Sequence, residues 1–189
     1  MPIGNAYATG SVISFIERHH INNERLNVLD VGCGIGHNGF IFREMFEIRY
    51  MRLKPGDWIH RLEAIEIFAR YQNPVWDYVY NKVMVCDCLK SAHTLKDGYY
   101  DIIFATELLE HLKKEQIYFL LDELLKKLKK DGSVIITIPV GDEGEIMKQK
   151  AVFDNPYETH QTYLTMKDFK RYHIKHKVNE GVFMIGQKR

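Results

Sequence analysis

Two acidic residues and two histidines form the group of side chains best suited to proton transfer or cation binding. Glu107, Glu110 and His111 stand at positions i, i+3 and i+4, so in a helix they share one face. His160 ends the segment 155–160, which we expect to fold back over the same place. Carboxylates and imidazoles bind divalent cations such as magnesium, manganese or zinc, and they also act as general bases. The alternative is purely structural, because the helix dipole favours acids in a first turn.

A glycine-rich turn follows the first predicted strand. Residues 28–36, VLDVGCGIG, place Asp30 at the strand end and then a glycine at every second position. Glycine tolerates positive φ angles and lets a ligand approach the main chain, so this turn is predicted to cradle a ligand. Residues 34–39 also match the dinucleotide pattern G-x-G-x-x-G. That pattern starts directly after its strand, whereas Gly34 lies four residues past Asp30, so a nicotinamide cofactor is disfavoured.

Two further acids end the second and third predicted strands. Glu66 ends the second, where a carboxylate can accept hydrogen bonds from both hydroxyls of a ribose. Glu63 is the alternative, but in an alternating strand it faces the opposite side. Asp87 ends the third strand and has Cys88 beside it. Ligands of open α/β sheets bind at the carboxyl ends of the strands, so we expect these acids and the glycine turn to line one pocket.

An alternation of predicted strands and helices supplies the sheet that these residues need. Hydrophobic runs and helical apolar spacing distinguish the two kinds of element. Strands are predicted at 26–32, 59–68, 82–87, 99–106 and 132–140, followed by a hairpin of 172–178 and 182–188. Helices are predicted at 8–20, 38–53, 69–80 and 107–130. This order predicts an α/β fold with a mainly parallel seven-stranded sheet, helices on both faces and a C-terminal antiparallel hairpin.

The size of the chain indicates one domain, which we take to span residues 1–189. Residues 1–25 are expected to form an N-terminal helix and lid. Residues 141–163, the longest irregular segment, are expected to form a lid over the substrate. The 26 Lys and Arg residues against 25 Asp and Glu residues leave a net charge of +1, which argues against a nucleic-acid partner. No apolar stretch approaches the roughly 20 residues of a membrane span. Together with the three cysteines and the lack of a signal sequence, this predicts a cytoplasmic protein.

The turn Asp30-x-Gly32-x-Gly34-x-Gly36 resembles the first motif of the class I S-adenosylmethionine (SAM)-dependent methyltransferases, and the resemblance extends from about residue 26 to the closing hairpin. It implies a Rossmann-like fold, with SAM as the cofactor. In this family the turn lies under the methionine part of SAM, and Asp30 orders the turn or meets the methionine ammonium. The cofactor-binding residues implied are Asp30, Gly32, Cys33, Gly34, Gly36, Glu66, Asp87, Cys88 and Thr106.

The segment Glu107–His111 resembles the E-x-x-E-H segment of methyltransferases that act on small hydroxylated molecules. Comparable acid–histidine sets occur in ubiquinone-biosynthesis-type O-methyltransferases and in small-RNA terminal 2′-O-methyltransferases. The resemblance implies His111, His160 and Glu107 as catalytic residues. A divalent cation is a candidate second cofactor, with ligands from Glu107, Glu110, His111 and His160.

The expected function is therefore an enzyme that transfers a methyl group from SAM to a small-molecule acceptor. The favoured reaction is O-methylation of a sugar, a phenolic compound or a natural-product-like molecule. Two alternatives stay open: a metal-dependent RNA 2′-O-methyltransferase, and a non-catalytic SAM-fold subunit that binds or activates a partner.

Overall fold

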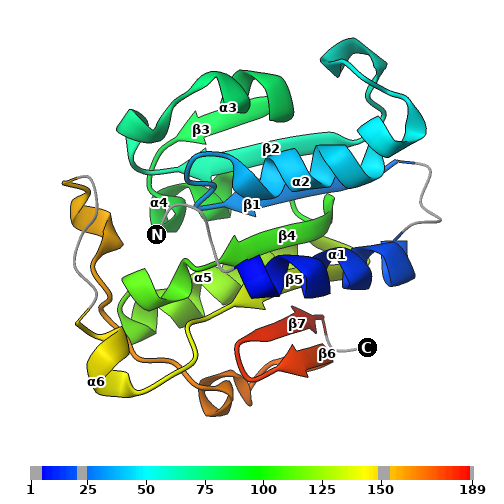
Figure 1. The fold of residues 1–189 in the computed structure, drawn as a ribbon. Coiled ribbons are helices and arrows are strands. Elements are labelled where there is room, and N and C mark those ends of the chain that lie inside the picture. Colours follow the sequence, from blue (N-terminus) through cyan, green and yellow to red (C-terminus); the bar gives the residue numbers. More distant parts are fainter. Residues whose placement is uncertain (1–5, 21–24, 149–153, 188–189) are drawn as a thin grey trace.

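Seven strands form one mixed sheet in the computed structural model, which describes residues 6–20, 25–148 and 154–187 (Figure 1). The strands are β1 Asn27–Val31, β2 Arg61–Glu66, β3 Lys82–Val85, β4 Tyr100–Thr106, β5 Leu128–Thr137, β6 His173–Asn179 and β7 Val182–Gly186. They lie in the order β3-β2-β1-β4-β5-β7-β6. Strands β1 to β5 pair in parallel, β7 is antiparallel to β5, and β6 is antiparallel to β7. The predicted fold class, including the C-terminal hairpin, is confirmed.

Helices cover both faces of this sheet (Figure 1). The α-helices are α1 Ala6–His20, α2 His37–Phe46, α3 Pro74–Val79, α4 Cys88–Ser91, α5 Lys114–Lys127 and α6 Glu143–Ile146. Short 3₁₀ helices are η1 Ile48–Tyr50, η2 Pro55–Asp57, η3 Ala69–Tyr71, η4 Ala92–Thr94, η5 Leu109–His111, η6 Pro156–Glu158 and η7 Met166–Phe169. None of the described helices combines the length and apolar character that crossing a membrane requires.

Neighbouring residues of the central strands face two different apolar cores. Leu29 of β1 and Ile103 of β4 pack on the side of α5. Val28 and Ile102, one position earlier in each strand, pack on the side of α1, α2 and α3. This alternation follows from the period of two in a β-strand, and it leaves the loops at the strand ends free to carry polar groups.

Three predicted helices are shorter than the sequence suggested. The helix predicted at 69–80 is reduced to α3 Pro74–Val79, because Asn73 caps it in an extended conformation and the preceding residues 69–71 form the 3₁₀ turn η3. The helix predicted at 38–53 ends at Phe46, where Glu47 leaves the helical conformation with φ −127°. The buried Glu47 carboxylate accepts hydrogen bonds from Arg43 and from the backbone N–H of His60, which draws the chain back toward β2. The helix predicted at 107–130 starts only at Lys114 and ends at Lys127.

The predicted lids lie only partly within the described residues. Residues 1–5 and 21–24 of the N-terminal segment and residues 149–153 of the second segment lie outside them. Helix α1 packs into the core through the buried Phe15 and Ile16. The closing of either segment over a substrate stays a prediction.

Candidate active site

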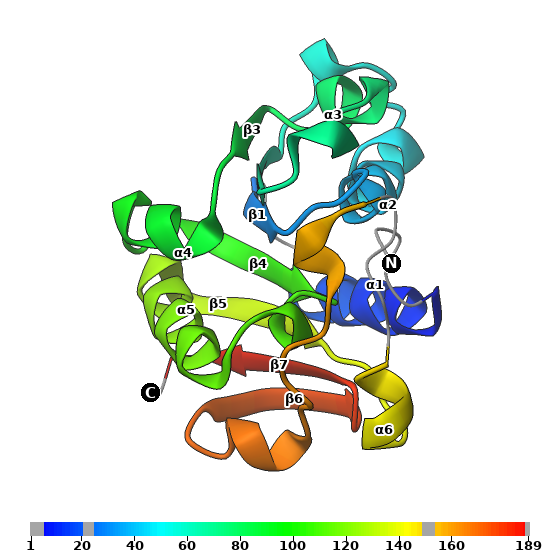
Figure 2. The ribbon, with the colours of Figure 1, turned by 90° about the vertical axis from the view of Figure 1, so that its left-hand side faces the viewer.

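A cavity of about 280 Å³ opens at the carboxyl edge of the sheet. Strands β1 and β4 are neighbours there, and the connections that follow them run to opposite halves of the sheet. Such a switch point is where open α/β sheets bind ligands. Figure 2 looks toward this edge. The segment that begins at residue 154, drawn in orange and called the crossing segment below, runs across it. The cavity walls come from the loops after β1, β2, β3 and β4 and from that crossing segment.

The glycine turn after β1 has positive φ angles of the kind that the sequence predicted and that glycine adopts without strain. The φ angles of Gly32, Gly34 and Gly36 are 74°, 53° and 96°. The Gly32 and Cys33 N–H groups donate to the carbonyl of Ile65 at 2.8 and 3.2 Å, which ties the turn to β2. Gly32, Cys33 and Gly34 line the cavity. Gly36, which was also expected from the sequence to meet the cofactor, does not line it and is instead the N-cap of α2.

Glu66 connects the end of β2 to the glycine turn. Its carboxylate accepts the Gly34 N–H and the Phe68 N–H, both at 2.8 Å, and it lines the cavity. Burial raises the pKa of Glu66. The alternative, Glu63, accepts hydrogen bonds from Tyr100 and Arg61 instead and does not line the cavity. The geometry therefore favours Glu66 as the acid that meets a ligand here.

Asp30 lies beneath the turn and is fully buried. Its carboxylate accepts a hydrogen bond from the Tyr80 hydroxyl at 2.6 Å and another from the Asn38 amide at 3.2 Å. The same amide donates to Thr106 Oγ1 at 2.8 Å, and both Asn38 and Thr106 line the cavity. Because Asp30 does not itself line the cavity, the geometry favours its role in ordering the turn. Burial raises the pKa of Asp30 to about 6.

The loop after β3 forms the far wall of the cavity. Asp87 accepts the Leu89 N–H at 2.9 Å and caps α4, while also lining the cavity. Cys88 lines the cavity next to it, and burial raises the pKa of this thiol to about 12. The structure also adds Cys86 to the lining, so the three cysteines of the chain surround one cavity.

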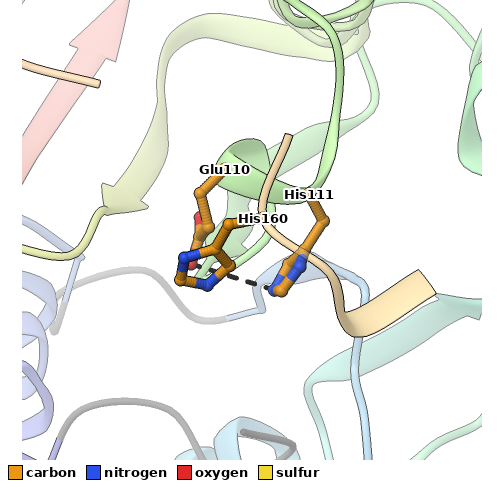
Figure 3. Close-up of side chains that lie close together, drawn as sticks. All are labelled: Glu110, His111 and His160. Carbon is orange, nitrogen blue, oxygen red and sulfur yellow. Dashed lines mark ion pairs between the residues drawn. The ribbon is translucent and has the colours of Figure 1, made fainter. Parts of the chain in front are cut away.

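Three of the four predicted acid–histidine residues, Glu110, His111 and His160, lie together in the structure (Figure 3). Ligand atoms of Glu110, His111 and His160 lie within 4.8 Å of one another. The His111 and His160 rings meet edge to face with centroids 4.9 Å apart, and His111 Nε2 lies 4.0 Å from Glu110 Oε1. His160 Nδ1 lies 2.8 Å from the carbonyl of Ile146. A carbonyl only accepts, so this contact places a proton on Nδ1 and, in the neutral ring, leaves Nε2 as the acceptor.

Glu107 stands apart from that group, which corrects the expectation of one shared helix face. Residues Glu107–Lys113 precede α5, and Glu107 has a left-handed backbone with φ 49°. Its N–H donates to Thr137 Oγ1 at 3.0 Å, and that hydroxyl donates to Glu107 Oε1 at 2.8 Å. These bonds to β5 hold Glu107 against the sheet edge, so it lines the cavity without reaching the two imidazoles.

Burial changes the protonation of this group. It lowers the pKa of His111 to about 4, with a further lowering by His160, so His111 is neutral at pH 7. Burial, followed by the charge of Glu107, raises the pKa of Glu110 well above its ordinary value. Glu110 Oε2 is buried and has no hydrogen-bond partner among the described residues. The group thus offers the neutral His111 imidazole as a proton acceptor, and in Glu110 a buried carboxyl group that ionises more readily when a cation is bound beside it.

The sequence pattern missed the residues that cover the cavity. Tyr71 of η3 and Asn155, Glu158 and Gln161 of the crossing segment all line it. The Tyr71 hydroxyl donates to Glu158 Oε1 at 2.5 Å and accepts from the Asn155 amide at 3.1 Å. The expected fold-back of residues 155–160 and the irregular character of residues 141–163 indicated that this segment could reach the site, but neither pointed to Glu158 or to its contact with Tyr71.

Comparisons with known proteins agree with this fold. The model of the methyltransferase domain family matches residues 6–173. A search of curated proteins gave no match. Among solved structures, a TehB-like SAM-dependent methyltransferase from Corynebacterium glutamicum ATCC 13032 superposes with a TM-score of 0.60 at 13% identity, covering 97% of this chain and 89% of that chain. Monomeric WbdD superposes with a TM-score of 0.57 at 14% identity, covering 96% of this chain and 41% of that chain.

A third similar structure is the 1,6-didemethyltoxoflavin-N1-methyltransferase from Burkholderia thailandensis. Its TM-score is 0.52 at 18% identity, with 72% of this chain and 54% of that chain covered. It contains 1,6-didemethyltoxoflavin and S-adenosylhomocysteine (SAH). This chain spans about half the length of several of the structures it matches, including 53% of a SAM-dependent methyltransferase from Archaeoglobus fulgidus.

The sheet order, the glycine turn and the acid at the end of β2 define the class I SAM-dependent methyltransferase fold. Because the family model matches most of its length, the chain belongs to the methyltransferase domain family.

Proposed function

We propose that this protein transfers a methyl group from SAM to a hydroxyl group of a small acceptor, such as a sugar, a phenolic compound or a natural-product-like molecule. The observation that carries the proposal is that neutral His111 lines the same cavity as the glycine turn and Glu66. Oxygen acceptors benefit from proton removal, and a neutral imidazole within that cavity can accept the proton.

The residues at the cavity fit SAM. The positive-φ turn exposes main chain to a ligand, and both oxygens of Glu66 are held in place by backbone N–H groups. We assign Gly32 to Gly34 to the methionine part, Glu66 to the ribose and Asp87 to the adenine. When bound, SAM supplies an electrophilic methyl group. Residues of the crossing segment line the same cavity, and a site covered in this way favours methyl transfer over side reactions with water.

Two histidines are candidate bases. His111 lines the cavity and its lowered pKa keeps it neutral at pH 7, so it is free to accept a proton, although the same low pKa limits how strongly it holds that proton. His160 is the alternative, because the Ile146 carbonyl orients its ring and leaves Nε2 as the proton acceptor in the neutral form. Replacing His160 with glutamine is expected to lower turnover by roughly 10²–10⁴-fold if it is the base. SAM affinity should hardly change. His93→Gln is the matched control, since His93 is exposed and does not line the cavity.

We also propose a divalent cation held by Glu110, His111 and His160. The spacing of their ligand atoms within 4.8 Å and the unpartnered Glu110 Oε2 support this arrangement. A cation would compensate the buried carboxylate and polarise an acceptor hydroxyl. Glu107, the fourth ligand expected from the sequence, is not part of this set.

The experiment measures methyl transfer from radiolabelled SAM to a panel of polyols and phenols, with and without EDTA. Loss of turnover with EDTA and recovery with manganese or magnesium would support the proposed cation. Turnover that is unchanged by EDTA in metal-free protein would contradict the cation and support direct base catalysis by a histidine. SAM binding without transfer to any acceptor would contradict the enzyme and favour the non-catalytic subunit.

A further inference from the structure

The crossing segment brings one more carboxylate to the cavity than the cofactor assignments use. Glu158 lies at the end of η6, is only 7% exposed and lines the cavity together with Asn155 and Gln161. Figure 2 shows this segment running across the carboxyl edge of the sheet, between the region of β1 and the hairpin. An acid buried at such a place needs a compensating interaction, because desolvation opposes its charge.

Several hydrogen bonds fix the position of Glu158. The Tyr71 hydroxyl donates to its Oε1, and Tyr71 also accepts from Asn155. Downstream, the Gln161 N–H donates to the carbonyl of Glu110 at 2.7 Å, and Thr162 Oγ1 donates to the carbonyl of Leu112 at 2.6 Å. The segment is therefore bound on both sides of the cavity, and Glu158 is held over it.

Glu158 lies between the two ends of the site. Burial raises the pKa of Glu66, and the Glu158 charge adds to that rise at the ribose end. Glu158 lines the same cavity as Gly34 and His111, so its carboxylate borders the space that a cofactor bound between the glycine turn and the acid–histidine group would occupy.

The cavity as a whole favours positive charge. Its acidic lining residues are Glu66, Asp87, Glu107 and Glu158. None of the lining residues in the described part of the chain is a lysine or an arginine. The sulfonium of SAM carries a positive charge that the thioether of SAH lacks. The two ligands therefore have similar shapes but differ by one methyl group and one positive charge.

We propose that Glu158 is a cofactor-selecting residue, whose carboxylate favours SAM over SAH and so promotes release of the spent cofactor. The proposal rests on the proposed function only in taking SAM as the ligand of this cavity. The effect is electrostatic and acts through the low-dielectric interior, where a fixed charge is felt strongly.

The test compares dissociation constants for SAM and SAH by isothermal titration in the wild type and in Glu158→Gln. Glutamine keeps an oxygen that accepts from Tyr71 but removes the charge. The ratio of the two affinities cancels effects that do not depend on the ligand's charge. We expect the preference for SAM relative to SAH to fall roughly tenfold, a change of about 1.4 kcal/mol. Glu143→Gln, an exposed acid of α6 outside the cavity, should leave the ratio unchanged.

The conservative variant Glu158→Asp keeps the charge, so its ratio should stay within about threefold of the wild type. An unchanged ratio in Glu158→Gln would overturn the proposal, as would equal weakening of both ligands or identical behaviour of the Asp and Gln variants. If the wild type binds neither SAM nor SAH, the proposed function fails instead. If it binds both while the ratio does not respond, only this inference fails.

Discussion

Replacing Asp30 with asparagine is expected to remove a large pH dependence from the stability of this protein. The side chain is fully buried beneath the glycine turn, and burial raises its pKa from the ordinary 3.8 to about 6. The hydrogen bonds from Tyr80 and Asn38 oppose the rise but do not cancel it. The folded protein therefore holds a proton on Asp30 over a pH range in which the unfolded chain has lost it.

The sign and size follow from linkage. A carboxyl group with a raised pKa in the folded state contributes full stability below its unfolded pKa and loses it as pH rises through the folded value. The difference between 3.8 and about 6 corresponds to about 3 kcal/mol, at 1.36 kcal/mol per pKa unit. The free energy of unfolding should thus fall by this amount between about pH 4 and 7 because of Asp30 alone.

Urea unfolding at several pH values in that range measures this effect in the wild type and in Asp30→Asn. The amide oxygen of the variant can still accept from Tyr80, whereas its NH2 group cannot accept from Asn38. The loss of that second hydrogen bond lowers stability equally at every pH and does not change the shape of the pH profile. Glu110, whose pKa is also raised by burial, acts equally in both proteins and cancels in the difference. The charge of Glu66 adds to the raised pKa of Asp30, so this contribution belongs to the effect that the comparison measures. We expect the wild type to lose about 3 kcal/mol relative to the variant as pH rises. Parallel pH profiles for the two proteins would refute the account of Asp30 as a desolvated carboxyl group.

Three further substitutions test the cofactor loop and its packing. Gly34→Val should abolish SAM binding in titration while the protein remains folded by circular dichroism, because a β-branched residue strains at φ 53°; wild-type affinity would refute the loop assignment. Glu66→Ala should weaken SAM binding by about 1–3 kcal/mol, whereas the control Glu63→Gln should not; the reverse order would move the ribose role to Glu63. Gly39→Ala should lower the free energy of unfolding by about 1–3 kcal/mol, since a Cβ there would lie 2.7 Å from Val79 Cγ2; undiminished stability in thermal melts would show that α3 can shift.

The seven strands and the cofactor turn could be predicted from the sequence because their causes are local. Apolar runs such as residues 28–31 bury themselves on both faces of a sheet, and strand alternation separates Glu66 from Glu63 without any knowledge of neighbours. The positive φ angles at Gly32, Gly34 and Gly36 could be anticipated because glycine, which has no Cβ, adopts such angles readily.

The acid–histidine group could be predicted only in part. Its four residues were identified by type, but their helical spacing suggested a shared face that does not exist. The backbone at Glu107 is set by Thr137, a residue 30 positions further along the chain. A periodic pattern carries no information about such a partner, so the start of α5 at Lys114 could not be inferred.

The tertiary structure decided which distant groups meet and how far they are desolvated. His160 reaches Glu110 and His111 only because the crossing segment is bound to the backbone of η5. Glu158 reaches the cavity through Tyr71, a residue 87 positions away. Residue type and period are properties of a short stretch of chain, whereas burial, pKa and the assembly of a site depend on contacts between stretches that only the folded chain brings together.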